Sequence, residues 1–109
     1  MARTPIHPGE ILADELEEIG LSAKKLADVI EVPPNRLYQL LAGKRNVTAD
    51  TALRLSQYFG MSADFWMNLQ LRWDLYFAQS EETGILKEIQ PYVSHTRMEH
   101  AIRDGGESN

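Results

Sequence analysis

The sequence contains no cysteine and only three histidines, His7, His95 and His100. Without cysteine the chain can form neither a disulfide framework nor a thiolate metal site, and three scattered histidines do not suggest zinc. No apolar run approaches the roughly 18–20 residues that a membrane-spanning helix needs. The first residues contain two prolines and no apolar core, so we expect no secretory signal peptide and a cytoplasmic protein.

Signals of catalysis are also missing. An enzyme needs a nucleophile beside a base, or a metal cluster. The chain has no cysteine nucleophile, and no Ser–His or Glu–His spacing stands out. We therefore expect no catalytic residue, no metal and no cofactor, and we interpret the chain as a binding protein and not as an enzyme.

Charge is distributed unevenly along the chain. The 109 residues carry a net charge of −5, which by itself argues against binding to nucleic acid. Residues 22–46, however, contain five basic and two acidic residues, whereas residues 1–21 contain one basic and five acidic residues. Binding to phosphates requires a local positive potential and not a positive total. A basic segment within an acidic chain is therefore compatible with DNA binding.

Helix signals follow one another with short gaps, and strand signals are nearly absent. The caps and apolar spacing predict an all-α fold with five helices, at roughly 8–19, 23–31, 34–42, 49–59 and 63–79. The apolar stripe of the first helix is predicted to be Leu12, Leu16 and Ile19. We expect a flexible arm over residues 1–6, one domain over 7–80, and a partly disordered extension over 81–109 with at most a short helix before Pro91.

Residues 22–43 have the pattern of a helix-turn-helix, in which two short helices cross steeply through a tight turn. A small residue, Ala27, stands where the two helices touch. The apolar positions that lock the second helix onto the first and onto the core are also filled, by Leu26, Ile30, Val32, Leu37 and Leu40. One residue disagrees with the pattern. Glu31 occupies the turn position where glycine is common because the backbone there is left-handed.

The polar side of the helix predicted over 34–42 carries residue types that read DNA. Arg pairs with guanine, and Asn or Gln with adenine, at base edges in the major groove. We assign base reading first to Arg36 and Gln39, and next to Asn35 and Tyr38. Residues on either side of this helix are better placed to bind phosphates, and they are Ser22, Lys24, Lys25, Lys44 and Arg45.

Three further stretches resemble one family. They are residues 7–12 (HPGEIL), 43–55 (GKRNVTADTALRL) and 65–70 (FWMNLQ), within a similarity that covers roughly Ile6–Phe77. The chain resembles the HigA-type antitoxins, a branch of the Xre and phage-repressor-like helix-turn-helix proteins. The resemblance implies a lambda-repressor-like fold. It also implies an antitoxin that dimerises, represses its own promoter and binds a small RelE-like ribonuclease toxin, which cuts mRNA on the ribosome.

Two surfaces agree with these implied partners. The helix predicted over 63–79 is more apolar than one core-facing stripe requires, and we assign a dimer interface to Trp66, Leu69, Trp73 and Phe77. The acidic first helix offers a surface to a basic toxin, at Glu10, Asp14, Glu17 and Glu18. Other interpretations stay open: the acidic run as a solvated face, the apolar belt as a surface covered by the tail, and the chain as a solitary Xre-type regulator without a toxin.

Overall fold

The structure of the protein is a computed structural model that describes residues 4–93. Within these residues the chain forms five α-helices and no strand, so the predicted all-α helix-turn-helix fold is confirmed. The helices are α1 (Pro8–Ile19), α2 (Ala23–Ile30), α3 (Pro34–Leu41), α4 (Ala49–Phe59) and α5 (Ala63–Glu88). The prediction of a disordered tail falls largely on residues 94–109, which lie outside the described part of the chain.

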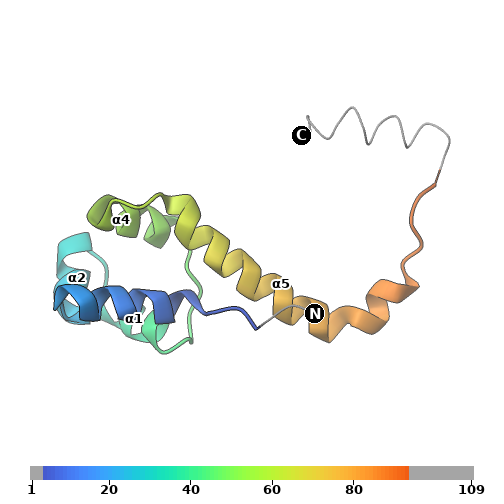
Figure 1. The fold of residues 1–109 in the computed structure, drawn as a ribbon, viewed down its shortest axis with the longest axis horizontal. Helices are drawn as coiled ribbons and strands as arrows, with labels where there is room; N and C mark the ends of the chain where they lie inside the picture. The colour runs from blue at the N-terminus through green and yellow to red at the C-terminus, as the bar shows by residue number, and fades with distance from the viewer. Residues whose placement is uncertain (1–3, 94–109) are drawn as a thin grey trace.

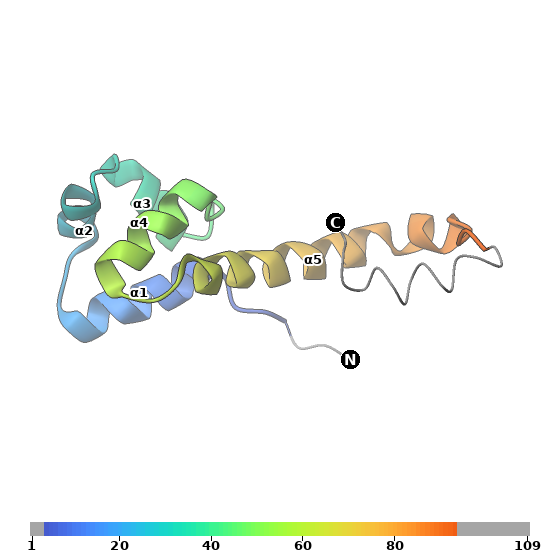
Figure 2. The ribbon, with the colours of Figure 1, turned by 90° about the horizontal axis from the view of Figure 1, so that it is seen from above.

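Helices α1 to α4 gather at one end of the molecule, and α5 leaves this bundle as a long rod (Figures 1 and 2). A helix of 26 residues is about 39 Å long at about 1.5 Å per residue. Only Trp66 and Gln70 of α5 are buried, so just its first turns pack on the bundle. No helix within residues 4–93 combines the length and the apolar character that crossing a membrane requires.

The core lies between α1, α2, α3, α4 and the start of α5. Its fully buried apolar side chains come from all five helices, and the largest are Leu12, Leu26, Leu37, Leu40, Leu55 and Trp66. Ile19 was predicted to join Leu12 and Leu16 in this core, and that prediction is wrong. Ile19 is 49% exposed because it is the last residue of α1, where the helix gives way to the turn at Gly20.

The end of α5 differs from the prediction. The sequence predicted a helix that stops near Gln79 and a separate short helix before Pro91, but one helix continues to Glu88. The hydroxyls of Ser80 and Thr83 donate to the carbonyl oxygens of Tyr76 and Gln79, one turn back, at 3.1 and 2.6 Å. These side chains are therefore satisfied within the helix and do not break it.

Candidate DNA interface

The helix-turn-helix consists of α2, a left-handed residue and α3. The hydroxyl of Ser22 accepts a hydrogen bond from the backbone N–H of Lys25 at 3.1 Å and so caps α2. Glu31 then adopts φ 61° and ψ 51°, which confirms the left-handed backbone expected at this position. The N–H of Val32 donates to the carbonyl of Ala27 at 3.0 Å and turns the chain toward α3.

The packing predicted for this unit is confirmed. Ala27 has no exposed surface, and the apolar residues that lock α3 in place are all buried, namely Leu26, Ile30, Val32, Leu37 and Leu40. Helix α3 also packs on α1, where Gly9 lies directly against the carbonyl of Leu40. The unit is thus held from two sides, which fixes the direction of its polar face.

The predicted base readers lie on the outward side of α3, but they are not equivalent. Asn35 and Tyr38 are exposed, Tyr38 by 47%, whereas Arg36 and Gln39 are half-buried at the edges of this side. The Oε1 atom of Gln39 accepts a hydrogen bond from Nε of Arg45 at 3.1 Å. A residue predicted to bind phosphate therefore orients one predicted to read bases.

The predicted phosphate-binding residues are all exposed: Ser22, Lys24, Lys25, Lys44 and Arg45. Lys24 lies 3.6 Å from Asp28, one turn along α2, but both side chains remain largely in solvent. Such an exposed pair is weak, so Lys24 stays available to a phosphate. Of these residues Arg45 is joined to α3 directly, through its hydrogen bond to Gln39.

Two residues that the sequence did not assign complete this surface. Asp50, in the first turn of α4, lies 2.9 Å from Nη1 of Arg36 through Oδ2 and 3.0 Å from Nε of Arg54 through Oδ1. The spacing of Asp50 and Arg54, one helical turn apart, is a sequence signal for an ion pair. Nothing in the sequence indicated that Arg36, from another helix, would join them.

Arg54 also closes the turn between α2 and α3. Its Nη1 atom donates to the carbonyl oxygens of Ile30 at 2.7 Å and Glu31 at 3.2 Å. The last carbonyls of a helix lack partners within the helix, and a cation there is favoured by the helix dipole. Arg54 therefore stabilises the end of α2 and the strained backbone of Glu31 together.

The Asp50 carboxylate is held in its charged form. Hydrogen bonds from Arg54 and then Arg36 keep the pKa of Asp50 below its usual value. The cluster therefore contains two cations and one anion at neutral pH, beside the outward face of α3.

The side chain of Gln70 in α5 holds the loop between α3 and α4 in place. The buried side chain of Gln70 accepts from the N–H of Val47 at 2.7 Å and donates to the side chains of Asn46 and Asp74 at 3.2 and 2.9 Å. This loop carries Lys44 and Arg45, so Gln70 positions the predicted phosphate contacts without touching them. A Gln between Leu69 and Leu71 in the apolar part of α5 is the signal for this role in the sequence.

The residues assigned to a dimer interface fall in different environments. Trp66 is fully buried between Phe59 and Phe65, so it belongs to the core and has no surface to offer a second copy; this part of the assignment is wrong. Leu69 and Trp73 are half-buried, and Phe77 is 38% exposed. The acidic residues assigned to the toxin surface are all exposed along α1, at Glu10, Asp14, Glu17 and Glu18.

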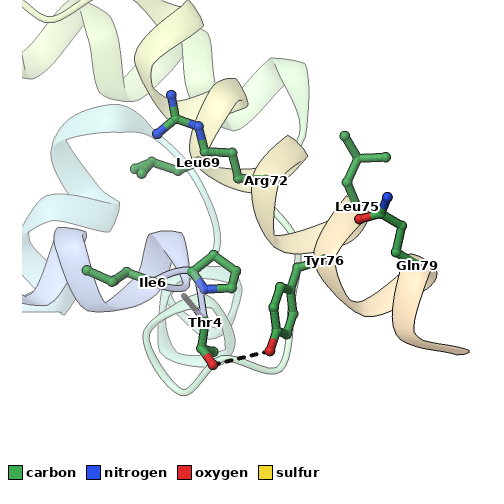
Figure 3. A pocket seen from close by; sticks show the side chains of 8 residues that line it. Thr4, Ile6, Leu69, Arg72, Leu75, Tyr76 and Gln79 are labelled. Carbon is green, nitrogen blue, oxygen red and sulfur yellow. Dashed lines mark hydrogen bonds between the residues drawn. The ribbon is translucent and has the colours of Figure 1, made fainter. Parts of the chain in front are cut away.

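A shallow groove runs between residues 4–6 and α5 (Figure 3). The hydroxyls of Thr4 and Tyr76 lie 3.4 Å apart across it. Its lining is mainly apolar, with Arg72 at one side, and consists of Thr4, Pro5, Ile6, Leu69, Arg72, Leu75, Tyr76 and Gln79. The described part of the predicted arm therefore lies against α5, next to the half-buried Leu69.

The chain has relatives both among known sequences and among solved structures. Residues 12–66 match the family described as Helix-turn-helix. The chain is 47% identical over 81 residues to Virulence-associated protein I of Dichelobacter nodosus, covering 73% of this chain and 75% of that protein. It is also 47% identical to an addiction module antidote protein of the HigA family from Coxiella burnetii, with a TM-score of 0.78 and coverage of 83% and 100%. Pseudomonas aeruginosa antitoxin HigA, solved with the higBA promoter, is 42% identical with a TM-score of 0.77, covering 82% and 99%.

Proposed function

Because this chain belongs to the helix-turn-helix family and, within it, to the HigA-type antitoxins, we propose that it binds operator DNA and neutralises a partner toxin. In this proposal it is a repressor of its own operon, and the toxin is a RelE-like ribonuclease that cuts mRNA. The observation that carries the proposal is the outward face of α3, with exposed Asn35 and Tyr38 bordered by basic residues. The relative from Pseudomonas aeruginosa was solved with the higBA promoter, which supports DNA binding by this chain.

The proposed complex with DNA places α3 in the major groove. Asn35, Arg36, Tyr38 and Gln39 then face base edges, and the basic residues of α2 and of the loop after α3 face phosphates. Two copies related by a two-fold axis would place their α3 helices about 34 Å apart, on an inverted repeat. Apolar side chains left exposed on α5, such as Leu75 and Phe77, support that dimer.

The toxin surface is proposed on the acidic side of α1. A RelE-like ribonuclease is basic, and the exposed carboxylates of Glu10, Asp14, Glu17 and Glu18 are complementary to it. Co-expression with the neighbouring gene, followed by a pull-down, tests this part. Retention of a small basic protein, lost in a Glu17→Lys/Glu18→Lys variant but kept in an Asp64→Lys control, supports the antitoxin. Absence of any such neighbour favours a solitary Xre-type regulator.

The DNA-binding part is tested with duplexes from the chain's own upstream region. Gln39→Ala is expected to cost about 1–3 kcal/mol and to relax the preference at one base position. Lys44→Ala is expected to weaken binding to all sequences equally and to make the salt dependence shallower by about 0.9 in the log–log slope. If Gln39→Ala weakens all sequences equally, Gln39 binds phosphate and does not read a base.

A further inference from the structure

Arg36 is not free to approach DNA in this structure. It is the third residue of α3, beside the buried Leu37 and at the edge of the outward face, and only 29% of its side chain is exposed. Within residues 4–93 its ion-pair partner is Asp50, whose Oδ2 lies 2.9 Å from Nη1 of Arg36. The side chain therefore points toward the start of α4 and is held there by a charged hydrogen bond.

Arg54 shares the same carboxylate but is anchored differently. Besides Oδ1 of Asp50, it bonds the carbonyls of Ile30 and Glu31. Loss of the Asp50 charge would leave Arg54 attached to these two carbonyls, whereas Arg36 would lose its partner. Asp50 thus controls one of the two arginines, and that arginine is the one beside the outward face of α3.

We propose that Asp50 is a specificity-determining residue that competes with DNA for Arg36. The inference depends on the proposed DNA-binding function. To contact DNA, Arg36 must give up Asp50, and the negative charge of Asp50 is then left beside the phosphates. A bidentate contact to guanine in the operator offsets this loss with two hydrogen bonds. On DNA of unrelated sequence, a single contact to a phosphate offsets less of the lost ion pair. Arg36 therefore stays bound to Asp50 on such DNA.

Asp50→Asn tests this competition in the full chain. The variant keeps the size of the side chain but removes the charge, so Arg36 becomes available to any phosphate. We expect several-fold tighter binding to a scrambled duplex and a salt dependence steeper by about 0.9 in the log–log slope. The ratio of operator affinity to scrambled-duplex affinity is expected to fall.

Asp64→Asn is the matched control. Asp64 lies in the first turn of α5, as Asp50 lies in the first turn of α4, and it takes part in no ion pair among the described residues. Both variants remove one negative charge near the positive end of a helix. If the two variants bind the scrambled duplex alike, the proposal is wrong. It is also wrong if Asp50→Asn weakens operator binding without strengthening binding to the scrambled duplex.

Arg36→Ala gives a second test that does not depend on Asp50→Asn remaining folded. In the otherwise unchanged chain it should lower affinity for the operator more than affinity for the scrambled duplex, where only the loss of one positive charge beside Asp50 acts. In the Asp50→Asn chain it should remove the gained affinity, since Arg36 is the released cation. An equal loss on both duplexes in the unchanged chain overturns the proposal. An unmodified protein that prefers no upstream sequence over the scrambled duplex contradicts the proposed function itself.

Discussion

His7 combines two structural roles at the start of α1. Its Nδ1 atom accepts a hydrogen bond from the backbone N–H of Gly9 at 2.8 Å and caps the helix. Its ring contacts the ring of Trp73 of α5 edge-on, with 4.8 Å between centroids. Burial lowers the pKa of His7, and the negative charges of Glu10 and Asp74 oppose this shift only in part. The cap requires the neutral ring, because a protonated Nδ1 cannot accept the hydrogen bond from Gly9.

The stability of the fold should therefore depend on pH through His7. Its folded-state pKa is below the unfolded value of about 6.5, so the unfolded chain takes up the proton first as pH falls. The contribution of His7 to stability is fully present above about pH 6.5 and is lost progressively below it. We expect the melting temperature to drop more for the unmodified protein than for His7→Asn, which can cap α1 without titrating. If the melting temperatures of the two proteins fall equally between about pH 7.5 and about pH 5.5, His7 is not the cause of the pH dependence.

Single residues were predictable from the sequence where the signal is local. The left-handed backbone of Glu31 followed from its place in the turn, and serine, which caps α2 at Ser22, is among the residue types that cap helices most often. The contacts of Arg36 with Asp50 and of Arg54 with the carbonyl of Ile30 were not predictable, because these partners lie 14 and 24 positions away. Such contacts depend on how α2, α3 and α4 cross, and no local pattern encodes that.

Among whole elements, α1 approaches α3 closely at Gly9. A side chain at Gly9 would overlap the backbone carbonyl of Leu40, which cannot move without shifting α3. We expect Gly9→Ala to destabilise the fold by about 1–3 kcal/mol in urea unfolding. Gly84→Ala in α5, where nothing lies nearby, should stabilise it by about 0.5–1 kcal/mol. If Gly9→Ala and Gly84→Ala change the free energy of unfolding equally, the packing of α1 on α3 does not depend on this contact.

Helices were predicted well where a cap marks each end and poorly where none does. The bounds of α1 and α4 agree with the prediction, since each begins after a cap residue and ends at a glycine. The end of α5 was missed because no glycine or proline stops it near Ser80 and its later residues pack on nothing that would give them a pattern. Apolar residues recur at helical spacing where one side of a helix is buried. A helix exposed on all sides therefore shows little of this pattern.

At the scale of the whole molecule, the shape depends on α5. Its later turns leave the bundle with apolar side chains in solvent, including Leu75 at 54%, Ile85 at 60% and Leu86 at 48% exposure. A single apolar residue at a surface is ordinary, but a series along one projecting helix is typical of an interface.

The proposed dimer gives a prediction at this scale. Phe77→Glu should weaken self-association by about 1.5–3 kcal/mol, roughly ten- to a hundredfold in the dissociation constant, because it places a charge where the dimer would bury a ring. Leu53→Glu, an equally drastic change at a 61% exposed residue of α4, should leave association unchanged. Sedimentation equilibrium measures both. A monomeric unmodified protein would remove the dimer from the proposed function.

The guanidinium of Arg54 has a consequence for protein engineering. The segment from Ser22 to Gly43 looks like a portable module, since it contains both helices, the turn and the predicted readers. Its turn is nevertheless closed by Arg54 and its Arg36 is restrained by Asp50, and both lie in α4. A graft of the two helices onto another scaffold would carry the predicted base-reading residues without the contacts from α4 that position them. A graft that includes α4 would keep the two helices and these contacts together.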